Sequence, residues 1–191
     1  MTEKSEFEKM RSAQMYSYFD AEITESLRKA ELFCARFNRT CMEDPDYRPA
    51  LENLIPGIPE SSFIAPPFRC DHGHGIHIGE DVIVNVGATM LDGGDITIRD
   101  HVKIGPNCSF YTSIHPMDYL ERRKPQETCK PITIGEDVWL GGNVVVCGGV
   151  SIGARSVIGA GSVVTRDIPE DCFAAGNPCR VIRKLKKYSH D

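Results

Sequence analysis

The sequence has no apolar run that could cross a membrane, since a transmembrane helix needs roughly 18 consecutive apolar residues. Residues 1–11 alternate acids and bases where a signal peptide would carry an apolar stretch. Positive charge is not in excess either, because the formal net charge is −5, which argues against nucleic acid or an anionic membrane as a partner. We therefore expect a soluble, cytoplasmic protein that binds neither.

Cysteine pairs in the C-x-x-C pattern are absent, although the chain has 8 cysteines. Their scattered spacing favours free thiols in a reducing compartment over a disulfide scaffold. With 17 glycines, 12 prolines and 41% hydrophobic residues, the composition is that of a globular protein, neither collagen-like nor disordered. At about 150 residues per domain, the 191 residues correspond to one domain with an appendage.

A large apolar residue recurs at every sixth position over most of the chain, with a two-residue slip after Met90 and a longer break after Phe110. This column consists of Ile78, Val84, Met90, Ile98, Ile104, Phe110, Ile134, Leu140, Val146, Ile152, Ile158 and Val164. A period of six fits neither an α-helix nor a simple strand, so the chain must turn once per repeat. Three such sides make a triangular coil of about 18 residues, and residues 76–168 are predicted to form a parallel β-helix of roughly five coils.

The segments before the repeat have other patterns. In residues 5–40, apolar residues recur at three- and four-residue spacings among charges, which predicts two or three short amphipathic helices. Residues 45–67 are rich in proline and are predicted to be an irregular connector. The chain therefore divides into a helical cap with its connector, residues 1–60, and a β-helix domain, residues 61–191.

A polar segment, residues 111–130, interrupts the apolar column and opens with His115. A polar loop of this length inside a compact repeat is more often functional than not. After Val164, residues 167–178 are expected to be a loop that returns along the coil. Residues 179–187 are basic and are expected to form a short helix or strand.

Several motifs occur together in these segments. They are Asn85 within a repeat, His115-Pro116 at the start of the loop, and the runs at 132–142, 157–165 and 174–178. In this combination the chain resembles the hexapeptide-repeat O-acetyltransferases, specifically the maltose and galactoside acetyltransferase branch. The resemblance covers nearly the whole chain. It implies an all-β core formed by a left-handed parallel β-helix with an N-terminal α-helical cap, assembled as a homotrimer with sites between adjacent subunits.

The resemblance also implies transfer of acetyl from acetyl-CoA to a sugar hydroxyl. A hydroxyl is a poor nucleophile near neutral pH, so its attack on a thioester needs a base of the histidine type. We expect His115 to accept that proton and Asn85 to orient the acceptor. A backbone N–H near Gly142 is expected to stabilise the tetrahedral oxyanion. Direct transfer needs proximity and orientation and no metal.

The residues that bind the two substrates follow from the same resemblance. The acceptor-binding residues would be Asp20, Asp71, Asn85, Asp92 and Trp139. Gly93 stands where the galactoside enzymes carry a second Asp, which favours a maltose-like or glucose-like acceptor. The CoA-binding residues would be Gly142, Ala160, Thr165, Arg166, Arg180 and Arg183. Glycine and alanine let an extended pantetheine approach the backbone, and the arginines suit phosphates.

Four alternatives remain open at this point. The cluster of Cys70, Asp71, His72, His74 and His77 offers zinc or copper ligands, but lacks a settled fourth ligand and is expected to be a polar rim of the acceptor cleft. A metal-dependent, carbonic-anhydrase-like β-helix enzyme needs three histidines that are not visible around His101 and His115. A non-catalytic scaffold has no use for the long loop. A covalent acetyl-cysteine route would use Cys108 or Cys147, whose positions are more typical of packing.

Overall fold

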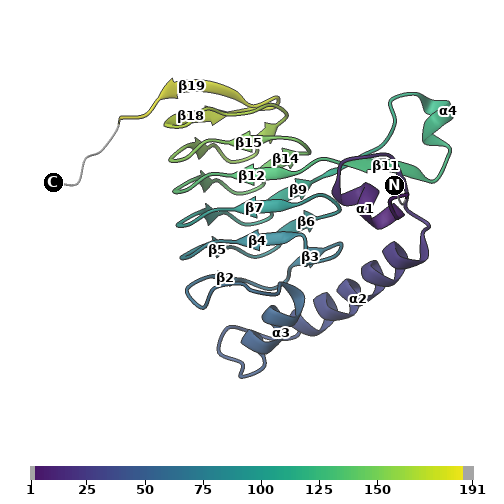
Figure 1. The fold of residues 1–191 in the computed structure, drawn as a ribbon. Coiled ribbons are helices and arrows are strands. Elements are labelled where there is room, and N and C mark those ends of the chain that lie inside the picture. Colours follow the sequence, from purple (N-terminus) through teal and green to yellow (C-terminus); the bar gives the residue numbers. More distant parts are fainter. Residues whose placement is uncertain (1–2, 187–191) are drawn as a thin grey trace.

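The structure is a computed structural model that describes residues 3–186 and contains a left-handed parallel β-helix of about six turns, with helices along one flank (Figure 1). Each turn contributes short strands to three sheets, one for each side of a triangular coil. Sheet I contains β2 (Phe63–Ile64), β5 (Ile83–Val84), β8 (Lys103–Ile104), β13 (Trp139–Leu140), β16 (Val157–Ile158), β18 (Cys172–Ala175) and β19 (Arg180–Lys184). Sheet II contains β3 (Arg69–Cys70), β6 (Thr89–Leu91), β9 (Ser109–Tyr111), β14 (Val145–Cys147) and β17 (Val163–Val164). Sheet III contains β4 (Ile76–Ile78), β7 (Ile96–Ile98), β12 (Ile132–Ile134) and β15 (Ser151–Ile152).

The chain passes through sheets I, II and III in that order and then begins the next turn. Neighbouring strands are parallel, with Ile132 opposite Ile96, and only β18 and β19 pair antiparallel within these sheets. In the fifth turn the third side is reduced to a single bridge between Ile152 and Ile168. The β-helix predicted over 76–168 is therefore confirmed. It begins two strands earlier than predicted, at β2.

Large apolar side chains fill the interior of the coil. All residues of the predicted apolar column, which recur at every sixth position, are buried except Ile78. Ile78 is partly buried and packs against the core. The small or branched residues four positions after each column residue are buried as well: Val82, Ala88, Val102, Cys108, Val138, Val144, Val150, Ser156 and Ser162. Because equivalent side chains stack between hydrogen-bonded turns, each turn buries the apolar face that its neighbour exposes.

Tight corners close the triangle. The corner from sheet III to sheet I holds one residue per turn with φ between 55° and 61°: Asp81, His101, Asp137, Arg155 and Asp171. The corner from sheet I to sheet II holds Gly87, Asn107, Asn143 and Gly161, also at positive φ. Asp, Asn and Gly adopt this conformation at the lowest cost, so they dominate both positions.

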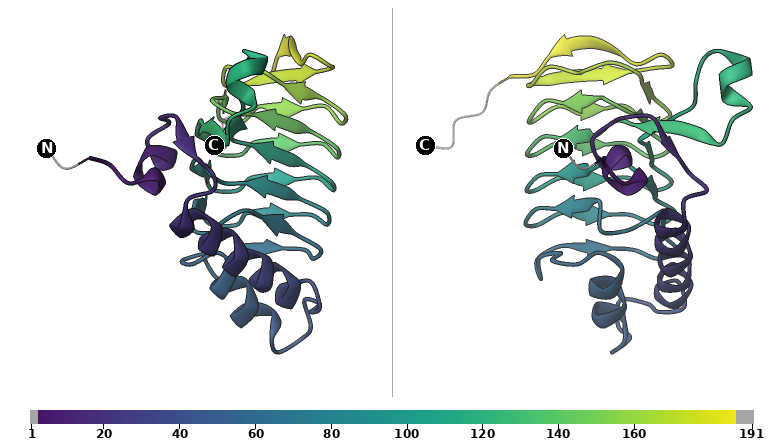
Figure 2. Two further views of the ribbon diagram at one scale, coloured as in Figure 1. Left: turned by 90° about the vertical axis from the view of Figure 1, so that its right-hand side faces the viewer. Right: turned by 45° about the vertical axis from the view of Figure 1, so that its right-hand side comes forward.

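Two helices precede the coil within residues 5–40, as predicted. Helix α1 (Glu6–Arg11) begins at a capping box formed by Ser5 and Glu8. Helix α2 (Ala21–Phe37) begins at Asp20, whose carboxylate accepts hydrogen bonds from two backbone N–H groups of the first turn. The buried residues of α2 are Ile23, Ala30, Cys34 and Phe37, and they form one face of the helix. Figure 2 shows α2 along the side of the first turns.

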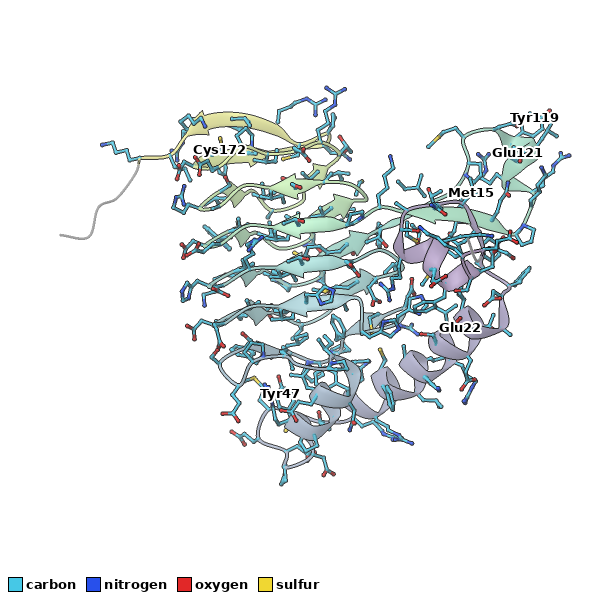
Figure 3. All side chains as sticks on the ribbon, in the orientation of Figure 1. Met15, Glu22, Tyr47, Tyr119, Glu121 and Cys172 are labelled. Atoms are coloured by element: carbon cyan, nitrogen blue, oxygen red, sulfur yellow. The ribbon has the colours of Figure 1, made fainter. Side chains whose placement is uncertain are left out.

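A third helix, α3 (Tyr47–Leu54), corrects the prediction of an irregular connector over residues 45–67. Its Pro49 lies in the first helical turn, where the missing N–H has no helical partner to lose. The Tyr47 hydroxyl donates to the Ile64 carbonyl at 2.8 Å and accepts from the Ile64 N–H at 3.1 Å. Leu51 and Leu54 are buried in the main core. The helix therefore closes the first turn of the coil (Figure 3).

The polar segment 111–130 folds into an arm rather than a simple loop. Strands β10 (Ser113–Ile114) and β11 (Gln126–Cys129) pair antiparallel, and α4 (Tyr119–Arg122) lies between them. Strand β11 also pairs antiparallel with β1 (Tyr16–Ser17), which connects α1 to α2. The arm and the N-terminal segment are thus parts of one small sheet, and α4 projects beyond the coil (Figures 1 and 2).

The C-terminal part differs from the prediction in one segment. Residues 167–178 contain β18, which continues sheet I, instead of a returning loop. The inward positions here are Cys172 and Ala174, which are too small to extend the pattern of large apolar residues although they are buried. Residues 180–184 form the strand β19, one of the two expected forms, and Lys187 lies outside the described residues. Among residues 3–186, no helix combines the length and apolarity that a membrane span requires.

Neighbouring positions on β8 test the inward column. Ile104 is 2% exposed, so Ile104→Ala should lower the free energy of unfolding by about 2–5 kcal/mol through lost burial and a residual cavity. Lys103 is exposed on the outer face, so Lys103→Ala should change it by less than about 1 kcal/mol. Urea unfolding followed by circular dichroism measures both, and equal losses would contradict the inward placement.

Candidate active site

His115 follows β10 where the arm leaves sheet II. Its side chain is 52% exposed and lines an open groove of about 420 Å³. Tyr111 of β9 and Cys147 of β14 form part of this groove from sheet II, and Met117 and Arg122 contribute from the arm. The β-helix therefore supplies a rigid wall, while the arm supplies the histidine.

The carboxylate of Glu127 is the nearest charged partner of His115, with Oε2 3.4 Å from Nε2. Glu127 lies on β11, one position along from the Ile114–Thr128 pair, so the hairpin register places it opposite His115. Its side chain is only 13% exposed, and it accepts a hydrogen bond from the Tyr16 hydroxyl. Burial, with contacts to Cys129 and Glu127, raises the pKa of Tyr16, so that hydroxyl stays a donor. Neither Glu127 nor Tyr16 was predicted from the sequence as a site residue.

A second group of acids lies where the coil slips by two residues. Asp92 is fully buried, and its carboxylate accepts hydrogen bonds from the backbone N–H groups of Asp71 (3.1 Å), His72 (2.7 Å) and Gly75 (3.0 Å). It thereby fixes the loop 71–75. Burial, followed by the charges of Asp92 and Glu127, raises the pKa of Asp71 to about 7. The charge of Glu127 therefore acts on Asp71, and Glu127 itself lies beside His115.

The other expected site residues lie mainly along sheet I. Asn85 follows β5, and Gly142 and Ala160 follow β13 and β16, so all three lie at the corner from sheet I to sheet II. The ladder runs through this corner, with the Gly161 N–H donating to the Gly142 carbonyl at 2.9 Å. Trp139 is 56% exposed on the outer face of β13, in register with Lys103.

His115 lies beyond the other end of sheet II, as do Thr165 and Arg166, which follow β17. Within one chain, Asn85 and His115 are thus on different corners of the triangle, separated by the side that sheet II forms. Asp20 is half-buried at the start of α2, where its carboxylate accepts the N–H of Glu22 at 2.9 Å. A single chain does not bring all the expected residues into one cavity.

The comparisons with known proteins agree with this architecture. Residues 131–166 match the family model described as bacterial transferase hexapeptide (six repeats). A hexapeptide-repeat-containing acetyltransferase from Vibrio cholerae, solved with acetyl coenzyme A, is 41% identical with a TM-score of 0.89, over 96% of this chain and 100% of the other. This chain belongs to the hexapeptide-repeat acetyltransferases.

Two further solved acetyltransferases have the same fold along nearly their whole length. A maltose O-acetyltransferase from Clostridium difficile 630 is 36% identical with a TM-score of 0.94, over 97% of this chain and 100% of the other. A galactoside acetyltransferase in complex with coenzyme A is 33% identical with a TM-score of 0.91, over 96% and 92%. Membership of this family decides against the carbonic-anhydrase-like and scaffold alternatives.

In this acetyltransferase the histidine cluster fastens the cap to the coil. His72 Nδ1 lies 2.8 Å from the Ser26 hydroxyl of α2, which lies 3.2 Å from His74 Nε2. His74 Nδ1 in turn lies 2.9 Å from a guanidinium nitrogen of Arg11 in α1. Burial lowers the pKa of His72 to about 4, so its ring is neutral. Among residues 3–186, no group of three His, Cys, Asp or Glu side chains is placed to hold a metal ion.

The tail of the acetyltransferase presents its arginines on β19, which is exposed along its length. Arg183 is in register with Phe173 of β18 and lies over its ring, 5.6 Å from the centroid. Arg180 pairs with Ala175, and its guanidinium donates to the Cys179 carbonyl at 2.7 Å. The last turn therefore carries a basic outer surface, at the opposite end of the coil from α3 (Figure 1).

The pKa of Asp71 predicts how stability depends on pH. Because its folded value of about 7 is above its ordinary value of 3.8, the folded state holds this proton longer, and the associated stability is lost as pH rises from about 4 to 7. Asp71→Asn cannot ionise, so its free energy of unfolding relative to wild type should increase over this range, by at most about 4 kcal/mol. Melting temperatures of both proteins at each pH measure this difference.

Comparison with wild type at each pH is needed because His72 acts in the opposite direction. Its folded pKa of about 4 means that the stability from the neutral ring is lost as pH falls below about 6.5. Gln14→Asn, at an exposed residue that does not ionise, is the control and should show a difference from wild type that does not change with pH. The same constant difference for Asp71→Asn would contradict the burial of its charge.

Proposed function

We propose that this acetyltransferase transfers the acetyl group of acetyl-CoA to a hydroxyl of a sugar, maltose-like or glucose-like, with His115 as the general base. The observation that carries the proposal is the pairing of His115 with Glu127 at the mouth of a groove. Relatives solved with acetyl-CoA and coenzyme A support the donor, and those named for maltose and galactosides support a sugar acceptor.

The Glu127 carboxylate gives the histidine a definite role. We infer that Nε2, 3.4 Å from the Glu127 carboxylate, carries the ring proton, so that Nδ1 is the lone-pair nitrogen that takes the proton from the acceptor hydroxyl. The hydroxyl oxygen then attacks the thioester carbonyl, and the tetrahedral intermediate collapses as the C–S bond breaks. The imidazolium returns its proton to the departing thiolate, which yields the acetyl ester and CoA. Glu127 stabilises the transient imidazolium, and Tyr16 holds Glu127 in place.

The oxyanion needs a donor that is not already occupied. Within residues 3–186, the Gly142 N–H makes no hydrogen bond. We propose it as the donor to the tetrahedral oxygen, with Asn85 orienting the acceptor. Since Asn85 and Gly142 lie on a different corner of the coil from His115, a complete site takes residues from two copies of the chain. This supports a homotrimer with its sites between adjacent subunits.

The remaining expected residues divide between the two substrates. Asp20, Asp71 and Trp139 would contact the sugar, and Asp92 would serve by fixing the loop that carries Asp71. The residues for CoA would be Ala160, Thr165, Arg166, Arg180 and Arg183, with the arginines on the phosphates. We assign the reaction to the cytoplasm because all 8 cysteines, which lie within the described residues, are free thiols.

Replacement of the base is the direct test. His115→Ala should lower kcat by about 10²–10⁴ with the fold intact, because proton removal from the hydroxyl is lost. Release of free thiol from acetyl-CoA measures this with glucose, maltose, a galactoside, an amino sugar and serine as acceptors. His101→Asn, at an exposed histidine of the corner from sheet III to sheet I, is the matched control and should keep full activity, because asparagine tolerates the positive φ of this position. Near-wild-type turnover of His115→Ala would refute the proposed mechanism.

A milder substitution tests the partner of the base. Glu127→Gln keeps the shape of the side chain but not its charge, and should lower kcat by about 10–100-fold with little change in the KM for acetyl-CoA. Glu121→Gln, at a partly exposed acid of the same arm that pairs with Lys124 and not with His115, should leave both constants unchanged. A raised KM with unchanged kcat for Glu127→Gln would assign Glu127 to binding and not to positioning of His115.

A further inference from the structure

The thiols of Cys34 and Cys70 are in contact, with their sulfur atoms 3.7 Å apart. Cys34 lies in the second half of α2, and Cys70 is the last residue of β3. The pair therefore joins the helical cap to the first turn of the coil across a long stretch of chain. We propose that Cys34 and Cys70 form a site of reversible oxidation, at which a hydroperoxide converts the two thiols to a disulfide.

The surrounding structure holds the two cysteines in place. Asn38, which ends α2, accepts the Phe68 N–H at 2.8 Å and donates to the Phe68 carbonyl at 2.9 Å. These two bonds fix the end of the helix to the chain two residues before Cys70. A disulfide needs the sulfurs at about 2.05 Å, so they must approach further by side-chain rotation of both residues.

The pair borders a surface groove, although Cys34 is only 5% exposed and Cys70 is partly buried. Cys34 and Cys70 both line a groove of about 310 Å³ between α2 and the outer face of sheet II. Arg69 lines the same groove, and its positive charge favours a thiolate. Hydrogen bonding from Cys70, opposed by burial, lowers the pKa of Cys34 to about 7, so Cys34 is the nucleophile.

The reaction balances with the hydroperoxide as the only oxidant. The Cys34 thiolate attacks the terminal peroxide oxygen, the O–O bond breaks, and Cys34 becomes a sulfenic acid while water or an alcohol leaves. The Cys70 sulfur then attacks the Cys34 sulfur, and the displaced hydroxide takes the Cys70 proton and leaves as water. Two thiols lose two electrons and two protons in total, and the peroxide is reduced by the same two electrons.

The other cysteines lack this arrangement. Cys129 contacts the hydroxyls of Tyr16 and Ser113, and the Cys108 thiol donates to the Gly141 carbonyl inside the coil. Among residues 3–186, no second pair of cysteine sulfurs is in hydrogen-bonding contact. The oxidation should therefore be selective for one pair.

The test uses the full-length protein, treated with hydrogen peroxide and then blocked with an alkylating agent. Digestion without reductant should yield one linked peptide pair, containing Cys34 and Cys70 and lacking two hydrogen atoms, which dithiothreitol separates. Because the disulfide would close a loop that contains α3, the melting temperature should rise by about 5–10 °C on oxidation and return on reduction.

Cys34→Ser and Cys70→Ser should each lose both the linked peptide and the rise in melting temperature. Cys41→Ser, at an exposed cysteine after α2, is the matched control and should keep both. If either serine variant folds poorly, wild type compared before and after dithiothreitol still decides the point. Oxidation that stops at sulfinic acid, links other cysteines or leaves Cys34 and Cys70 as thiols would overturn the proposal.

Discussion

The stacking of equivalent apolar side chains between hydrogen-bonded turns is the constraint on which the rest of the molecule depends. A strand of two or three residues cannot hold its own shape, so each turn exists only because its neighbours cover its faces. Every third side of the coil belongs to the same sheet, so its inward residue stacks on the inward residue of the turn before. The backbone hydrogen bonds between these strands allow only one register. Side chains that carry chemistry must therefore stand on the outer faces, at the corners, or on segments that leave the coil.

The candidate site lies where the six-residue period is broken. The slip after Met90 brings the Asp92 carboxylate into the protein, where it organises the loop 71–75. The longer break releases the arm, whose Thr112 hydroxyl donates to the Leu91 carbonyl at 2.6 Å and accepts the Gly94 N–H at 2.9 Å. The two departures from the period are thus bonded to each other. Their contact brings Asp71 and His115 to the same side of the coil.

The repeat could be predicted from the sequence because the spacing of apolar residues along the chain is enough to identify it. Inward positions such as Val146 and Ile158 need only be large and apolar, and the period places them without knowledge of any partner. The prediction is wrong for α3 because the number of prolines in residues 45–67 argues against a helix, whereas Pro49 lies in the first helical turn and breaks no helical hydrogen bond. It failed for β18 because Cys172 and Ala174 fill the last turn with small side chains.

The site was predictable only in part, for a physical reason. His115 could be named because the loop that carries it stands out from the repeat. Glu127 could not, since its role depends on the register of a hairpin whose strands are separated by α4. The residues 113–115 and 126–128 do not reveal that register in the sequence, because it follows only once the two segments are known to pair as a hairpin. Side chains that act in pairs across strands need the pairing before they can be recognised.

The distribution of charge along the coil favours one orientation of the donor in the proposed reaction. Glu127 lies beside His115, and burial, followed by the negative charges of Asp92 and Glu127, raises the pKa of Asp71 to about 7. Such an environment repels phosphate, so the phosphates of a CoA donor cannot lie there. The exposed arginines of β19 are on the last turn of the coil, whereas Asp71 follows β3 of the first turn and Glu127 lies on the arm. In the proposed reaction, the arginines of β19 hold the phosphates of the donor, and its neutral thioester faces His115. The separation of basic and acidic ends thus favours one orientation of the donor over its reverse.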